Sequence, residues 1–177
     1  MLKTLAFVTV IVVTLFTLAL PVQATNILFD ATLSGAQEAS PTGSTATGFG
    51  TVLLDDVADT IKVNLSWTSL VGGPATAAHI QGPAPIGLNA GVLFAFVGVP
   101  NTTSGFIPEQ TFAISLTEIA ELEADLLYFN IHNATFPGGE IRGQISATTA
   151  PVPEPATLFL VGSGLVGVLG LRKKLKK

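Results

Sequence analysis

Apolar and polar residues alternate over much of the chain between residues 25 and 150. The clearest segment is 60–67, in which every second residue from Ile61 to Trp67 is apolar. A period of two places these apolar side chains on one face of a β-strand. Such segments are short here and are separated by Gly, Pro, Asn and Asp. We therefore predict an all-β domain, an antiparallel Greek-key-like β-sandwich with one short helix.

The same pattern sets the bounds of the predicted elements. Ser115 and Glu118 have the spacing of a capping box, so the helix is expected from about Thr117 to Asp125. The acidic segment 55–59 predicts a tight solvated turn; it lacks the spacing of a twelve-residue calcium loop, which leaves calcium binding as the weaker alternative. Strands are predicted at residues 27–33, 48–54, 60–67, 75–81, 91–97, 127–132 and 140–146.

The chain begins with a segment that is typical of a secretory signal. Lys3 precedes an apolar run from Leu5 to Leu20, and Val22-Gln23-Ala24 follows as a cleavage site with small residues at both key positions. This order of basic, apolar and cleavage regions predicts a signal peptide over residues 1–24 and export by the Sec route. An uncleaved anchor helix is the alternative.

A second apolar segment lies near the C-terminus, between a proline-rich motif and a basic cluster. Residues 157–171 are almost entirely apolar, and residues 172–177 contain five Lys and Arg. As a helix, this apolar segment reaches about 22 Å, short of the roughly 30 Å hydrocarbon core, so it predicts a marginal transmembrane helix. The basic residues place the C-terminal end in the cytoplasm by the positive-inside rule.

The motif Val152-Pro153-Glu154-Pro155-Ala156, the Gly-rich apolar segment and the basic end resemble the PEP-CTERM sorting signal of Gram-negative bacteria. The resemblance covers residues 152–177. It implies that an exosortase, a membrane protease or transpeptidase, recognises Pro153, Glu154 and Pro155. The chain would then be anchored transiently in the inner membrane and delivered to the cell surface or the extracellular space. A plain tail anchor is the alternative.

These assignments divide the chain into three parts: a signal peptide (1–24), a β-domain (25–150) and a sorting segment (151–177). The β-domain keeps only two basic residues, Lys62 and Arg142, against eleven acidic residues, a formal charge of about −9. Nucleic acid is therefore excluded as a partner, because phosphate binding needs clustered basic residues. The chain has no cysteine, so the domain must fold on a hydrophobic core without disulfides.

The alternation of apolar and polar residues also places the polar side chains of three predicted strands on one face of the sheet. If segments 127–132 and 140–146 pair as a hairpin, their polar residues share that face, and the strand 75–81 adds two more. Gln144 lies on the same face. A solvated sheet face with a cross-strand ion pair is the alternative. The candidate binding patch consists of His79, Gln81, Tyr128, Asn130, His132, Glu140 and Arg142.

The same segments resemble the CHRD domain. The resemblance is carried by Ala78-His79-Ile80, by Leu-Tyr-Phe-Asn-Ile-His at 127–132, by Pro-Gly-Gly-Glu-Ile-Arg-Gly-Gln-Ile at 137–145, and by the opening motif at 33–38. It covers residues 27–147 and implies a β-sandwich that serves in extracellular interaction. Gln81 stands where the family usually has a second histidine, which weakens a metal role.

The leading functional hypothesis is a non-enzymatic surface or matrix protein that needs no cofactor and binds exopolysaccharide or other surface proteins. The sequence has no cysteine nucleophile, no Gly-x-Ser-x-Gly motif and no phosphate loop. The first alternative is a copper or zinc site at His79 and His132, joined by Glu140. The second is a polysaccharide hydrolase that uses carboxylates such as Glu109 or Glu140.

Overall fold

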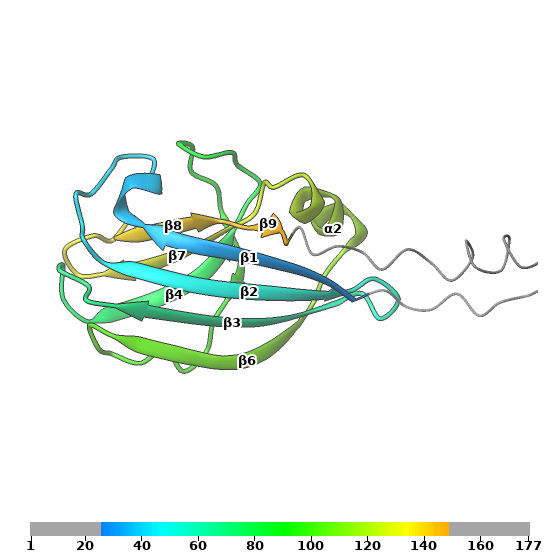
Figure 1. The fold of residues 1–177 in the computed structure, drawn as a ribbon, viewed down its shortest axis with the longest axis horizontal. Helices are drawn as coiled ribbons and strands as arrows, with labels where there is room; N and C mark the ends of the chain where they lie inside the picture. Colours follow the sequence, from blue (N-terminus) through cyan, green and yellow to red (C-terminus); the bar gives the residue numbers. More distant parts are fainter. Residues whose placement is uncertain (1–25, 149–177) are drawn as a thin grey trace, which may run out of the picture.

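The computed structural model describes residues 26–148, which form one β-domain (Figure 1). The predicted signal peptide, the Pro153-Glu154-Pro155 motif and the predicted transmembrane helix at 157–171 lie outside the described residues. In chain order the elements are β1 (Asn26–Ser34), the 3-10 helix η1 (Gly35–Gln37), β2 (Thr47–Asp55), β3 (Thr60–Thr68), β4 (Ala75–Gln81), β5 (Val92–Ala95), β6 (Gly105–Ala113), α2 (Leu116–Glu123), β7 (Tyr128–Asn133), β8 (Ile141–Gln144) and β9 (Ser146–Ala147).

The strands form one continuous antiparallel sheet with the order β5-β4-β7-β8-β1-β2-β3-β6, and β9 pairs with β1. The sheet folds over on itself, so that β1, β2, β3 and β6 face the layer that contains β4, β7 and β8 (Figure 1). The chain passes from one layer to the other after β3, β5 and β6. These connections between distant strands make the topology Greek-key-like, as predicted.

The sheet is nearly closed, because its outer strand β6 is linked to the segment that directly follows the other outer strand, β5. The Gln110 side chain on β6 accepts a hydrogen bond from the Val97 backbone N–H and donates one to the Val97 carbonyl, at 3.1 and 2.8 Å. The Phe96 and Phe112 rings meet edge to face beside this link. The predicted antiparallel all-β fold with one short helix is therefore confirmed for the described residues.

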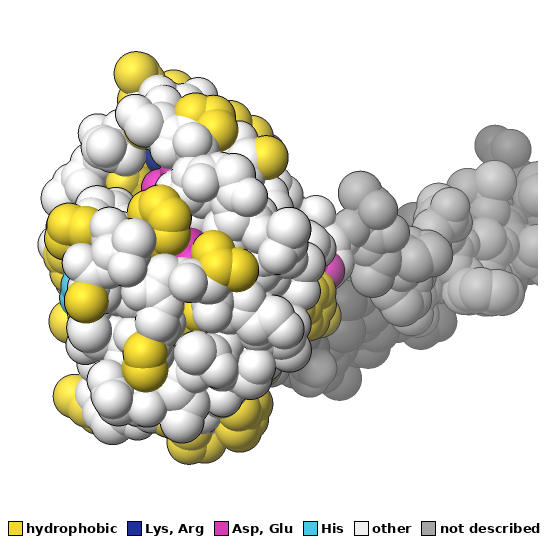
Figure 2. Space-filling model, turned by 90° about the vertical axis from the view of Figure 1, so that its left-hand side faces the viewer, with side chains coloured by type: hydrophobic (Ala, Val, Ile, Leu, Met, Phe, Trp, Pro, Cys, Tyr) yellow, Lys and Arg dark blue, Asp and Glu magenta, His cyan; other side chains and the backbone are white. Residues whose placement is uncertain are grey.

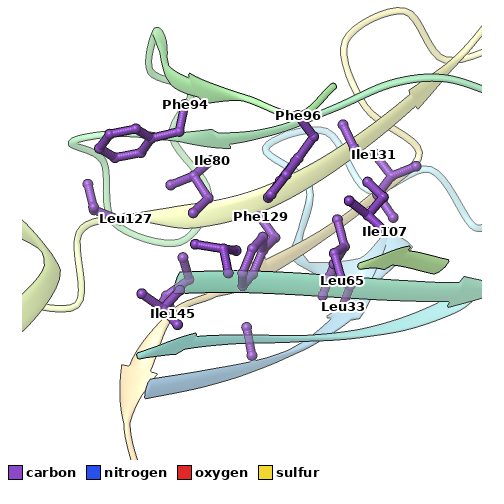
Figure 3. Close-up of a cluster of buried hydrophobic side chains, with 14 of the residues drawn as sticks. Leu33, Leu65, Ile80, Phe94, Phe96, Ile107, Leu127, Phe129, Ile131 and Ile145 are labelled. Atoms are coloured by element: carbon purple, nitrogen blue, oxygen red, sulfur yellow. The ribbon is translucent and has the colours of Figure 1, made fainter. Parts of the chain in front are cut away.

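The core lies between the two layers and is built from the inward positions of the alternating strands (Figure 3). Phe96 and Phe129 stack there with ring centroids 6.2 Å apart. Gly50 on β2 makes room for this packing, because a Cβ at that position would lie 2.6 Å from the Phe129 ring. Trp67 is also buried, with 1% of its surface exposed. The period-two pattern of the sequence thus predicts which side chains of the strands lie in the core.

The predicted elements agree with the structure apart from three details. Strand β6 was not predicted, because Pro108 and polar neighbours interrupt its alternation; proline is tolerated in this edge strand beside an irregularity in the β3–β6 pairing. The predicted strand 140–146 divides into β8 and β9 at Ile145. The predicted strand 91–97 shortens to β5. Within residues 26–148, no helix combines the length and apolar character needed to cross a membrane.

Candidate functional site

Strand β7 brings the predicted polar patch together. Its neighbours are β4 on one side and β8 on the other. Asn130 lies opposite His79 across one pairing and opposite Arg142 across the other. Tyr128 likewise lies opposite Gln81. Directly opposed residues in a sheet point to the same face, so the predicted hairpin and the shared polar face are both present.

This polar face is covered by protein. All six residues of β7 are buried, although only Phe129 and Ile131 belong to the hydrophobic core. The loop 82–91 lies over the face, and its Ala90 N–H donates a hydrogen bond to the Tyr128 hydroxyl. The solvated sheet face considered as an alternative is therefore wrong. Six patch residues are buried, and His79 alone is half-buried; the six are Gln81, Tyr128, Asn130, His132, Glu140 and Arg142.

Arg142 fastens the loop 82–91 to the sheet. Its two terminal nitrogens donate hydrogen bonds to the Leu88 and Pro85 carbonyls and to the Gln144 side chain. The guanidinium carbon lies 3.5 Å from the centre of the Tyr128 ring, a cation–π contact. Arg142 forms no ion pair with Glu140. The one salt bridge among the described residues is exposed and joins Lys62 on β3 to Glu109 on β6.

Glu140, which directly precedes β8, connects three segments of the domain through hydrogen bonds. One carboxylate oxygen accepts hydrogen bonds from the Ser44 hydroxyl and the Val71 N–H, at 2.6 and 2.7 Å. The other accepts from the Gly72 N–H and the Asn133 amide. Burial alone would raise the pKa of Glu140, but these four donors outweigh it and lower the pKa below its usual value.

His79 and His132 contact each other through their rings. Nδ1 of His79 and Nε2 of His132 are 3.1 Å apart, and Nδ1 of His132 is 3.1 Å from the Pro137 carbonyl oxygen. Burial lowers the pKa of both rings, and the neighbouring ring lowers that of His132 further. Within the described residues no group of three His, Cys, Asp or Glu side chains is placed to hold a metal ion. The copper or zinc alternative is therefore not supported.

A second buried carboxyl group, Glu38, lies just after η1 and was missing from the predicted patch. Only 6% of its surface is exposed, and its Oε1 has no hydrogen-bond partner among the described residues. Both polar atoms of the Asn130 amide and the Nε of Arg142 share this condition. Buried polar groups are almost always paired, so four such atoms in one region require an explanation.

Gly139 leaves room for the Asn130 amide and the Glu38 carboxyl group beside it. Its φ of 126° is accessible to glycine alone, and a Cβ there would overlap both the Asn130 amide and the Glu38 carboxyl. Burial raises the pKa of Glu38 to about 7. The charge of Arg142 and the Asn130 amide act in the opposite direction; the amide lies close to the carboxyl group without reaching the geometry of a full hydrogen bond. Glu38 thus changes charge near neutral pH, unlike Glu140.

A pocket of about 290 Å³ lies above Glu38, between the segment after η1 and the turn that joins β7 to β8. We call it the Glu38 pocket. Figure 2 shows this end of the domain: its surface is mostly uncharged, and acidic and basic side chains are visible only as small recessed points. The side chains that line the pocket and bear on its chemistry are Glu38, Ser40, Thr42, Asn89, Thr135 and Phe136.

Sequence reasoning missed Glu38 because it lies outside the alternating strands, on a segment whose position only the folded chain reveals. The one available signal was the opening motif at 33–38, which ends at this residue. Ser44 and Asn133, which hold Glu140, gave no signal of their own. Of the two carboxylates named for the hydrolase alternative, Glu109 forms an exposed salt bridge with Lys62 at 3.7 Å, and Glu140 accepts four hydrogen bonds.

Two family models match the chain. The model described as the CHRD domain matches residues 29–145, and the model described as the PEP-CTERM protein-sorting motif matches residues 151–174. Both resemblances found in the sequence motifs are thereby confirmed. The first match contains Glu38, Asn130, Glu140 and Arg142, so both buried carboxyl groups belong to the matched domain. No curated protein and no solved structure gives a significant match.

Proposed function

The chain belongs to the CHRD domain family and carries a sorting motif that implies processing by an exosortase; from this premise we propose that it is an exported protein of the cell surface or extracellular matrix. Its domain acts there as a non-enzymatic binding and structural module. Its partners are the exosortase during sorting, and afterwards exopolysaccharide or other surface proteins.

The observation that carries this proposal is the order of domain and motif. The last strand, β9, pairs with β1, and Thr148 donates hydrogen bonds to the Leu28 carbonyl from both its backbone and its side chain. The sorting motif begins at residue 151, directly after these contacts. Cleavage near Pro153 to Pro155 would therefore release a domain that keeps every strand and its whole core.

Two features favour a binding module over an enzyme. Within the described residues, neither histidine ring is hydrogen-bonded to a serine or threonine hydroxyl, so no activated nucleophile of the usual kind is formed. Arg142 and Glu140 direct their hydrogen bonds to loops of the domain itself. These polar groups stabilise the fold, and they leave binding to the pockets and loops between them.

In this proposal the chain is anchored in the inner membrane through residues 157–171 until it is sorted, with its basic C-terminus in the cytoplasm. The decisive experiment measures the intact mass of the chain from its native host, in the membrane fraction and in the surface or extracellular fraction. We expect a product that lacks the signal peptide and ends near Pro153 to Pro155, found outside the inner membrane.

A matched pair of variants sharpens the experiment. Glu154→Ala removes the acidic residue of the sorting motif and is expected to retain the full tail in the membrane. Thr149→Ala changes a residue just before the matched segment 151–174 and is expected to be processed normally. A chain that keeps residues 157–177 in the wild type, or equal processing of both variants, would contradict the proposal.

A further inference from the structure

Glu38 forms the polar floor of the Glu38 pocket. Its side chain is buried, and its Oε1 has no hydrogen-bond partner among the described residues. The Asn130 amide and Arg142 Nε share this condition, but they are fully buried and do not line the pocket. A buried polar atom without a partner destabilises the folded state, so the fold keeps this arrangement at the expense of stability.

The floor and walls of the pocket favour a ligand group that both donates and accepts hydrogen bonds. The Glu38 carboxylate accepts hydrogen bonds, and the Asn89 amide on the wall donates as well as accepts them. A hydroxyl group fits both, since it carries one donor and two acceptor lone pairs. The Ser40, Thr42 and Thr135 hydroxyls on the walls add further donors and acceptors.

The charge of the pocket favours an uncharged ligand. Arg142 is the one basic side chain near its floor, and its terminal nitrogens already donate to the Pro85 and Leu88 carbonyls. The domain as a whole carries a formal charge of about −9, which repels anions. A metal ion is not favoured either, because no third acidic or imidazole side chain joins Glu38 in the described residues.

Size and shape narrow the ligand further. A volume of about 290 Å³ lies at the small end of the roughly 300–1,000 Å³ that is typical of ligand pockets, so the pocket suits a single ring. Phe136 and Pro137 give the wall an apolar side. A ring that carries hydroxyls on its edge and C–H groups on its face would satisfy the polar floor and cover the Phe136 ring at the same time.

We propose that the Glu38 pocket binds one ring of a neutral, polyhydroxylated saccharide, with its hydroxyls on Glu38 and Asn89. This inference rests on the proposed function, since it names the ligand class of the binding module. It assigns Glu38 and Asn89 to ligand recognition, and it assigns Gly138 to the open mouth of the pocket.

The experiment is saturation-transfer NMR and calorimetry on the full chain, purified in a detergent without sugar groups. The probes are glucose, galactose, mannose and N-acetylglucosamine as neutral methyl glycosides, with glucuronic acid, glucosamine and calcium chloride as charged comparisons. We expect at least one neutral glycoside to bind and to exceed both charged sugars in affinity at pH 7.5.

Two variants test the place of binding. Glu38→Ala removes a polar floor group and is expected to weaken the neutral glycoside at least tenfold. Gly138→Tyr blocks the mouth without touching the floor, because a Cβ at Gly138 meets no atom within 4 Å, and it is expected to abolish binding. Gly91→Tyr is the matched control, since that glycine is equally open but lies outside the pocket.

Several results would overturn the inference. One is a failure of every neutral glycoside to bind the wild type, and another is binding that both Glu38→Ala and Gly138→Tyr leave unchanged. Stronger binding of glucuronic acid, glucosamine or calcium would assign the pocket to a charged ligand instead. A crystal structure grown with the glycoside that shows ordered water alone on Glu38 and Asn89 would also contradict it.

These outcomes are separate from the failure of the proposed function. The proposed function fails if the tail is retained in the host, which is read from the mass of the chain and involves no sugar. The saccharide inference fails in the binding assay on purified chain, whatever the result of sorting.

Discussion

Two carboxyl groups are buried at the same end of this domain, and their surroundings could hardly differ more. Glu140 is fully buried and accepts four hydrogen bonds, whereas Glu38 is 6% exposed and has one oxygen without any partner. The pKa of Glu140 is therefore lowered, and the pKa of Glu38 is raised to about 7. The two buried carboxyl groups thus shift in opposite directions, because burial dominates at Glu38 and the hydrogen-bond donors dominate at Glu140.

The comparison separates structure from recognition. Glu140 joins β8 to the segment after η1, to the β3–β4 loop and to β7, so its charge stabilises the fold. Glu38 has no hydrogen-bond partner on one oxygen, and its side chain lines a pocket. Local violations of the rules of polar satisfaction are expected where a protein binds something. Each of the following predictions tests one side of this contrast.

The largest effect is expected from Glu140→Ala. This change leaves the Val71 and Gly72 N–H groups and the Asn133 amide without their acceptor, so we expect a loss of at least about 3 kcal/mol in the free energy of unfolding. Denaturant unfolding followed by the fluorescence of Trp67, the single tryptophan, measures it. The matched control is Glu109→Ala, which breaks an exposed ion pair and should cost less than about 1 kcal/mol. Similar losses in both variants would remove the structural role of Glu140.

Glu38→Gln is expected to act in the opposite direction. The amide keeps the size of the side chain but removes the charge that burial disfavours, so the variant should be as stable as the wild type or about 1 kcal/mol more stable at pH 8. The same unfolding experiment applies. A loss above about 1 kcal/mol would show that the Glu38 carboxylate stabilises the fold, and the contrast with Glu140 would then disappear.

The pH dependence of that difference provides a sharper test. The folded-state pKa of Glu38 is above its unfolded value, so the native state binds the proton more tightly, and its contribution to stability falls as pH rises from about 4.5 to about 7. The stability of Glu38→Gln relative to the wild type should therefore increase over this window and remain constant above it. Glu140 has a lowered pKa, so its contribution is lost only as pH falls below 4.5. A difference that does not change between pH 4.5 and 7 would rule out the raised pKa of Glu38.

The smallest effect is expected from the two histidines. Their folded-state pKa values are lowered, so the unfolded chain binds protons more readily, and stability should decline as pH falls below about 6.5. His79→Gln removes the more exposed ring and should make this decline shallower. Thermal unfolding at pH 5.5 and 7.5 measures it, with Gln110→Ala as a comparison outside the pair. An unchanged slope in His79→Gln would contradict the burial effect.

The sequence contains enough information for most of the fold and for only part of the site. Seven strands and the capping box of α2 follow from alternation and local spacing, because those signals depend on neighbours in the chain. Strand β6 was missed, since its partner β3 compensates for Pro108 by an irregular pairing. The pairing of β7 with β8 was the condition on which the predicted polar patch depended, and the structure shows it.

The candidate site depends on contacts that alternation does not encode. Pairing placed Asn130 and Arg142 on one face, but only the folded chain shows that the loop 82–91 covers them. Glu38 reaches Asn130 across more than ninety residues, next to Gly139. A polar strand face has the same alternating sequence pattern whether water or a loop covers it. The burial of the polar patch therefore could not be predicted from the sequence.

The most direct test of the contrast is a pH titration of the side-chain carboxyl carbons in the chain labelled with ¹³C glutamate, followed by NMR. The chain has seven glutamates, and Glu38→Gln and Glu140→Gln identify the two signals. We predict that the Glu38 signal titrates near pH 7 and that the Glu140 signal titrates below 4.5. Titration of both groups at the ordinary value near 4.5 would contradict the account.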